Sequence, residues 1–163
     1  MNCFKAKYVA LVLMIFVLFT INLNAQTKTP ILKIDKLLQR IENKNDTLYI
    51  VNFWATWCKP CVAELPDFEK VNNDFKSGKV KVLLVSMDFK EELEKRVLPF
   101  ITKNNYMSEI LLLDETDGSF INKIHPEWSG AIPATLLIKN NKKLFIPKKT
   151  NYEELKSKII SSQ

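Results

Sequence analysis

Two cysteines separated by two residues are the most reactive feature of this sequence. Cys58 and Cys61 lie in the segment 57–61, Trp-Cys-Lys-Pro-Cys. A bridge between them closes a very small loop, and because disulfide stabilisation grows with loop length, it would add little to a fold. Thiol–disulfide exchange is therefore the chemistry that the pair predicts.

Metal binding is the alternative for such a pair. A structural zinc site needs four ligands, and the two cysteines supply half of them. His125, the one histidine of the chain, precedes Pro126 in a turn-like stretch, and we expect it to be solvated. Soft thiolates suit Cu(I), so a copper carrier is the stronger metal hypothesis. We expect no metal site and no cofactor.

A strand and a helix are predicted to meet at the cysteines. Residues 47–54 are almost all apolar, which is typical of a strand covered on both faces. In 60–75, apolar residues recur at spacings of three and four residues, which is typical of a helix. Cys58 would then lie at a helix N-terminus, where free N–H groups and the helix dipole stabilise a thiolate. Cys61 would lie deeper on the same face, placed to attack a mixed disulfide on Cys58. Pro60 suits the first turn, which needs no N–H from it.

Exchange also needs a proton acceptor, and Glu64 is the candidate because it lies one turn beyond Cys61. If Glu64 is buried, desolvation raises its pKa and allows it to take the proton of Cys61. A solvated glutamate, or one paired with Lys59 or Lys70, is the open alternative. Asn52, on the preceding strand, does not titrate and cannot be the base.

The remaining periodic segments predict a mixed α/β sheet flanked by helices. The predicted strands cover 47–54, 80–85, 110–113, 135–139 and 143–146, the last two forming a hairpin around 140–142. The predicted helices cover 34–41, 60–75 with a kink at Pro66, 90–104 with Pro99 weakening its second half, and a final helix capped by Asn151. The order strand, helix, strand over 47–85 predicts a right-handed βαβ unit.

Residues 1–25 are typical of a secretory signal peptide. Basic residues precede an apolar run, 8–21, and Ala25 is a small residue suited to cleavage. The run is shorter than the roughly 20 residues that span a bilayer as a helix, and an uncleaved membrane anchor is the alternative. Cleavage would remove Cys3 and leave one domain, 26–163, in the periplasm or elsewhere outside the cytoplasm.

The charge of the chain argues against nucleic acid as a partner. The net charge is +6, and the densest basic stretch, 139–149, contains Leu144, Phe145 and Ile146 and is typical of solvated strands. A nucleic-acid site needs more charge and more interleaved aromatic residues. Binding of nucleic acid is therefore not expected.

The segment 51–61, Val-Asn-Phe-Trp-Ala-Thr-Trp-Cys-Lys-Pro-Cys, resembles the active-site segment of thioredoxin-fold proteins. The segments 64–66 (Glu-Leu-Pro) and 85–88 (Val-Ser-Met-Asp) are similar to the TlpA/ResA-like branch, which comprises exported thiol–disulfide oxidoreductases. Residues 130–135, Gly-Ala-Ile-Pro-Ala-Thr, resemble its cis-proline loop. The resemblance covers about 48–160. It implies a thioredoxin-like fold with a helical insert before the cis-proline strand.

The resemblance also implies roles for single residues. Cys58 corresponds to the nucleophile, Cys61 to the resolving cysteine, and Glu64 to the acidic residue that tunes the thiols. Pro133 matches the cis-proline beside the disulfide, with an edge proline as the plain alternative, and the backbone of Ile132 would pair with an incoming peptide. The residues expected to contact clients are Trp57, Lys59, Pro60, Ile132 and Pro133.

Members of this branch mostly act as reductants, for example of apocytochrome thiols before haem attachment. The resemblance therefore implies reduction or exchange of disulfides in extracytoplasmic client proteins, with electrons from a membrane donor of the DsbD/CcdA type. An oxidant or an isomerase would require the same sequence motifs as a reductant. A copper carrier, or a client-binding module without turnover, is the alternative of a different class. We expect a monomer.

Two segments depart from the branch. Its N-terminal β-hairpin, with Gly-Lys before the central strand, is missing, and residues 39–47 are predicted to be a helix and a polar loop. The segment 121–129 is not diagnostic of the branch. Within it, Trp128 is predicted either to lie near the active site or to fill the core.

Overall fold

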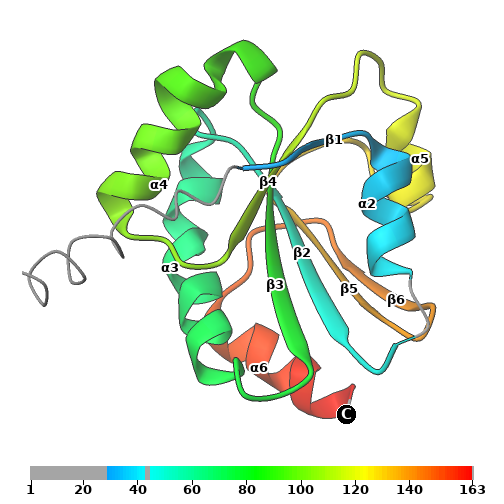
Figure 1. The fold of residues 1–163 in the computed structure, drawn as a ribbon. Coiled ribbons are helices and arrows are strands. Elements are labelled where there is room, and N and C mark those ends of the chain that lie inside the picture. The colour runs from blue at the N-terminus through cyan, green and yellow to red at the C-terminus, as the bar shows by residue number, and fades with distance from the viewer. Residues whose placement is uncertain (1–28, 43–44, 163) are drawn as a thin grey trace, which may run out of the picture.

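The computed structural model describes residues 29–42 and 45–162, and these form a six-stranded sheet with helices on both faces (Figure 1). The strands are β1 (Ile31–Leu32), β2 (Leu48–Trp54), β3 (Val80–Ser86), β4 (Glu109–Leu113), β5 (Ala134–Lys139) and β6 (Lys142–Ile146). The α-helices are α2 (Ile34–Ile41), α3 (Lys59–Asp74), α4 (Leu98–Asn104), α5 (Phe120–Ile124) and α6 (Tyr152–Ser161). The predicted signal peptide and Cys3 lie outside the described residues.

The strand order is β1-β4-β3-β2-β5-β6. The neighbours from β1 to β2 are parallel, whereas β5 runs antiparallel to β2 and β6 antiparallel to β5. This confirms the predicted mixed sheet, and β2, α3 and β3 form the predicted βαβ unit. All seven residues of β2 are buried, because the strand lies inside the sheet and helices cover both of its faces.

Successive side chains of β2 point to opposite faces of the sheet and supply two separate cores. Ile50 and Trp54 pack in the core on the side of α3 and α6. Val51 and Phe53 pack in the core on the side of α2 and α5. Asn52, between Ile50 and Trp54 in this alternation, therefore faces the side that holds α3.

The connection from β3 to β4 differs from the predicted helix 90–104. It consists of a 3₁₀ turn (Lys90–Glu92), a π-helical segment (Leu93–Val97) and α4. Pro99 lies in the first turn of α4 rather than in the second half of a longer helix, because the first turn tolerates a missing N–H. A second helix, α5, precedes β5, the strand that follows Pro133, in agreement with the helical insert that the resemblance implied before the cis-proline strand.

The hairpin at the sheet edge is tighter than predicted. Lys142 is already part of β6, so the turn consists of Asn140 and Asn141 alone, whose φ angles are 49° and 66°. Asparagine tolerates this left-handed region better than most residues, which suits a two-residue hairpin turn. The final helix begins as predicted, because the side chain of Asn151 accepts a hydrogen bond from the backbone N–H of Glu154.

Residues 29–42 and 45–162 contain no helix with the length and hydrophobicity needed to cross a membrane.

Candidate active site

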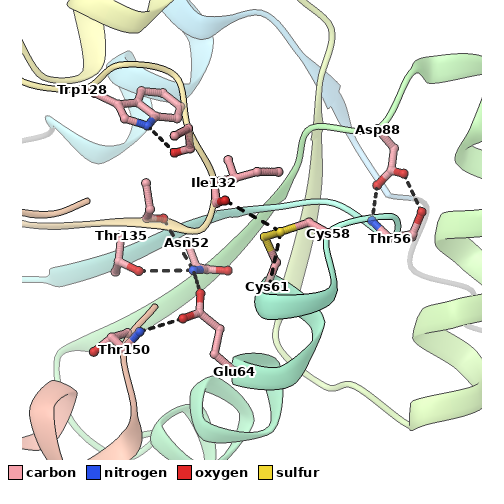
Figure 2. The surroundings of a disulfide bond; sticks show 12 residues. Asn52, Thr56, Cys58, Cys61, Glu64, Asp88, Trp128, Ile132, Thr135 and Thr150 are labelled. Carbon is pink, nitrogen blue, oxygen red and sulfur yellow. Dashed lines mark hydrogen bonds between the residues drawn. A yellow bond between two sulfur atoms is a disulfide. The ribbon is translucent and has the colours of Figure 1, made fainter. Parts of the chain in front are cut away.

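Cys58 and Cys61 form a disulfide at the N-terminus of α3, with a Cα–Cα distance of 5.2 Å (Figure 2). Cys58 is the N-cap residue, and its Sγ accepts a hydrogen bond from the backbone N–H of Cys61 at 3.3 Å. Cys58 is 6% exposed and Cys61 is fully buried. The outer sulfur thus belongs to Cys58, at the end of the helix that stabilises a thiolate.

The loop before β5 faces this disulfide. The peptide bond between Ile132 and Pro133 is cis, as the resemblance implied. The carbonyl oxygen of Ile132 lies 3.8 Å from Sγ of Cys58 (Figure 2). The loop and the end of α3, which are far apart in the sequence, therefore meet at the outer sulfur.

Trp128 supports the same loop. Its indole N–H donates to the carbonyl oxygen of Ala131 at 2.8 Å, one residue before Ile132. Its ring is buried against Phe53, with ring centroids 4.8 Å apart. Trp128 consequently meets both alternatives that the sequence left open: it fills the core, and it holds the loop that faces the disulfide.

Asp88 fixes the segment that leads into the cysteines. Its buried carboxylate accepts hydrogen bonds from the backbone N–H of Thr56 at 3.0 Å and from the Thr56 hydroxyl at 2.6 Å. The hydroxyl of Ser86 donates to it at 2.8 Å. From the sequence, Asp88 was recognised only as part of the segment 85–88, and no role was predicted for it. A carboxylate two residues after the end of a buried strand was the signal for it.

Glu64 is fully buried, as the redox hypothesis required. Its Oε1 accepts a hydrogen bond from Nδ2 of Asn52 at 2.7 Å, and its Oε2 accepts one from the backbone N–H of Thr150 at 2.8 Å. Burial raises the pKa of Glu64, and these two hydrogen bonds offset only part of that rise. The alternative pairing with Lys70 is wrong, because Lys70 forms an ion pair with Asp74 at 2.6 Å.

The expected client-contacting residues differ in their accessibility. Trp57 is 61% exposed, and Lys59 and Pro60 are exposed beside it. Ile132 is half-buried and Pro133 is buried. The open surface next to Cys58 is therefore formed by Trp57, Lys59 and Pro60, whereas the loop offers mainly its backbone.

His125 is not solvated as predicted. It is half-buried and stacks on Phe145, with ring centroids 4.7 Å apart and an interplanar angle of 13°. Its Nδ1 accepts a hydrogen bond from the backbone N–H of Glu127 at 3.3 Å. Over 29–42 and 45–162, no group of three or more histidine, cysteine, aspartate or glutamate side chains is arranged to hold a metal ion.

Comparison with known proteins agrees with this geometry. The model of the AhpC/TSA family matches residues 31–145, which include both cysteines and the cis-proline loop. Sporulation thiol-disulfide oxidoreductase A of Bacillus subtilis (strain 168) is 28% identical over 107 residues, covering 62% of this chain and 64% of that protein. Thiol-disulfide oxidoreductase ResA of Halalkalibacterium halodurans is 29% identical over 101 residues, covering 62% and 51%.

A solved structure shares the fold. The thioredoxin-related protein from Neisseria meningitidis serogroup B superposes with a TM-score of 0.63 at 21% identity, covering 75% of this chain and 89% of that one. The chain spans less than two thirds of the length of the two curated relatives described above. The family match, the fold and the cysteine pair lead to one assignment: the chain belongs to the AhpC/TSA family and is a TlpA/ResA-like protein with the thioredoxin fold.

Proposed function

We propose that the chain is a thiol–disulfide oxidoreductase that reduces or exchanges disulfides in client proteins outside the cytoplasm. The observation that carries the proposal is the Cys58–Cys61 disulfide at the N-terminus of α3, with the Ile132 carbonyl 3.8 Å from its outer sulfur. The relatives named thiol-disulfide oxidoreductases support it. The signal-like pattern of residues 1–25 supports export.

In the proposed reaction, the thiolate of Cys58 attacks a client disulfide. A bond forms between Cys58 and one client sulfur, the client S–S bond breaks, and the other client sulfur leaves and takes up a proton. Cys61 then loses its proton to the carboxylate of Glu64 and attacks Sγ of Cys58. The client leaves as a dithiol, and the two electrons it gained are balanced by the new Cys58–Cys61 disulfide.

The surroundings of Cys58 suit an extended peptide. The backbone of Ile132 would pair with the client, and the exposed ring of Trp57 would contact its side chains beside Lys59 and Pro60. Pro133 would lie against the mixed disulfide. Binding through the backbone and one aromatic ring gives little specificity for the client's sequence, which suits an enzyme with several clients.

The same proposal includes the direction of electron flow and the partners. We infer a reductant, re-reduced by a dithiol donor of the DsbD/CcdA type and active as a monomer, with apocytochrome c as one client class. These choices rest on the resemblance to the TlpA/ResA-like branch, since the site geometry suits reduction and oxidation equally.

Trapping of the intermediate tests the proposal. Purified reduced Cys61→Ser protein, mixed with a disulfide-containing peptide, is expected to form a stable mixed disulfide at Cys58 that intact-mass measurement detects. Cys58→Ser protein is the matched control and should form none, with Cys3→Ser present in both proteins so that Cys3 contributes no thiol. The unaltered chain should reduce insulin disulfides at the expense of dithiothreitol. Tight Cu(I) binding by a protein that forms no mixed disulfide and does not turn over would instead establish the copper-carrier alternative.

A further inference from the structure

The side-chain amide of Asn52 has hydrogen bonds at one end only. Its Nδ2 lies near three oxygens: Oε1 of Glu64 at 2.7 Å, Oγ1 of Thr135 at 3.2 Å and the carbonyl oxygen of Ala134 at 3.5 Å. Its Oδ1 is buried and has no hydrogen-bond partner within the described part of the chain. A buried carbonyl oxygen without a partner destabilises a fold. A hydrogen-bond donor to Oδ1 would therefore stabilise the protein.

The neighbours of the amide fix which way it points. The carbonyl oxygen of Ala134 and the ionised carboxylate of Glu64 can each accept a hydrogen bond but cannot donate one. A flipped amide would bring its oxygen against these two oxygens, so the nitrogen must face them. Oδ1 is therefore held on the side of Asn52 away from Glu64.

Cys61 lies on the side that Oδ1 faces. Ile50 and Trp54, the residues on either side of Asn52 on the same face of β2, belong to the core that also contains Cys61. Figure 2 shows the oxygen end of Asn52 directed toward Cys61 and its nitrogen end toward Glu64 and Thr135. In the disulfide, Cys61 has no S–H to donate. Reduction supplies one, and fully buried Cys61 has no access to bulk water.

We propose that in the reduced protein the thiol of Cys61 donates a hydrogen bond to Oδ1 of Asn52, so that one amide links the resolving cysteine to Glu64. The inference rests on the proposed function, since it concerns the reduced state of the same pair. A dithiol donor supplies two electrons and two protons, the Cys58–Cys61 bond breaks, and the donor becomes a disulfide. One of the protons stays on Cys61 as the S–H that Asn52 accepts.

The hydrogen bond exists in only one redox state, so it must shift the redox equilibrium. Asn52 stabilises the reduced pair, because Oδ1 gains a partner only on reduction. In Asn52→Leu, a similar volume remains without the acceptor. The equilibrium constant against glutathione should shift toward the disulfide by about threefold to tenfold, or about 15–30 mV to more negative potential.

Thr135→Val is the matched control for that measurement. It removes another neighbour of the Asn52 nitrogen and leaves Oδ1 untouched, so the potential should stay that of the unaltered protein. The proposal is overturned if Asn52→Leu leaves the potential unchanged, or if both variants shift it equally.

A second measurement reports on the hydrogen bond itself and needs no client. In reduced protein carrying Cys3→Ser and Cys58→Ser, Cys61 is the only thiol. Its infrared S–H stretching band should lie below the frequency of a free thiol, and should return to that frequency when Asn52→Leu is added. A band at the free-thiol frequency in the protein that keeps Asn52 would contradict the hydrogen bond. Loss of exchange activity in the unaltered chain would reject the proposed function and leave this band unaffected.

Discussion

Glu64 and Glu109 each accept hydrogen bonds on both carboxylate oxygens, but from different kinds of donor. Glu64 is held by the amide of Asn52 and a backbone N–H, both neutral, and burial raises its pKa. Glu109 is also partly desolvated, which raises its pKa, but two hydrogen bonds from Arg40 (2.5 and 2.6 Å) and the ammonium of Lys81 at 3.2 Å lower it further. The pKa of Glu109 is lowered overall.

The difference separates a carboxylate that can exchange a proton from one that holds the scaffold together. Neutral donors fix the position of Glu64 without fixing its charge. The guanidinium of Arg40 keeps Glu109 ionised and joins the last turn of α2 to the start of β4. We therefore expect substitutions at Glu64 to act on exchange and substitutions around Glu109 to act on stability.

Replacing Glu64 should have the largest effect. Glu64→Gln removes the proposed proton acceptor, and since a general base contributes about 10²–10⁴-fold, resolution of the mixed disulfide should slow by about a hundredfold at pH 7. Stopped-flow measurement of client release gives this rate. Glu109→Gln is the control and should keep the rate within about twofold. Equal slowing in both variants would erase the distinction between the two carboxylates.

Removing the partner of Glu109 should affect stability instead. Arg40→Met leaves a partly buried carboxylate with Lys81 as its remaining cation, and the free energy of unfolding should fall by about 1–2 kcal/mol. Partial exposure of both side chains limits the effect. Urea unfolding measures it. A loss of exchange activity in folded Arg40→Met protein at unchanged stability would show that this pair also serves the active site.

The pH dependence of stability should have opposite signs at the two carboxylates. The raised pKa of Glu64 adds stability that is present below the ordinary carboxyl pKa and is lost as pH rises through the folded value. Glu64→Gln should thus gain stability relative to the unaltered protein as pH rises. The lowered pKa of Glu109 adds stability above the ordinary value that is lost on acidification, so the deficit of Glu109→Gln should shrink at low pH. Unfolding measurements at a series of pH values test this. If the stability difference from the unaltered protein changes with pH in the same direction for both variants, the prediction is wrong.

The smallest effect is expected at Lys81, which supports Glu109 from the exposed side. Lys81→Gln should lower the free energy of unfolding by only a few tenths of a kcal/mol, because exposed ion pairs contribute about 0–1 kcal/mol. The effect should vanish at high salt. A loss of unfolding free energy as large as that of Arg40→Met would mean that charge alone, rather than the bidentate hydrogen bonding of Arg40, holds Glu109.

The sequence predicted features that are local in the chain. The continuous apolar run of β2, the helix that begins at the cysteines and the Asn151 cap were all visible as patterns over a few residues. The burial of Glu64 was foreseen as one of two alternatives. The hydrogen-bond partners of Glu64 were not foreseen. Thr150 lies 86 residues away in the sequence, and Asn52 was considered only as a possible base and excluded because it does not titrate. The bond from Arg40 to Glu109 spans 69 residues and left no local signal.

Local rules also failed where backbone chemistry competes with periodicity. The apolar spacing of 90–104 predicts one continuous helix, whereas the structure has a π-helical segment and restarts the α-helix next to Pro99. The N–H of Leu98 bonds to the carbonyl of Leu93 there. Side-chain spacing carries no information on which carbonyl an N–H selects, so this change of helix type could not be read in advance.

The opposite pKa shifts of Glu64 and Glu109 can be measured by titrating the two side-chain carboxyl carbons with ¹³C NMR, because this method reports each group in one sample of folded protein. We expect Glu64 to titrate above the ordinary pKa of a glutamate and Glu109 below it. Glu64→Gln protein assigns the first signal and Glu109→Gln protein the second. A Glu64 signal that titrates at or below the ordinary value would contradict the assignment of Glu64 as the proton acceptor for Cys61.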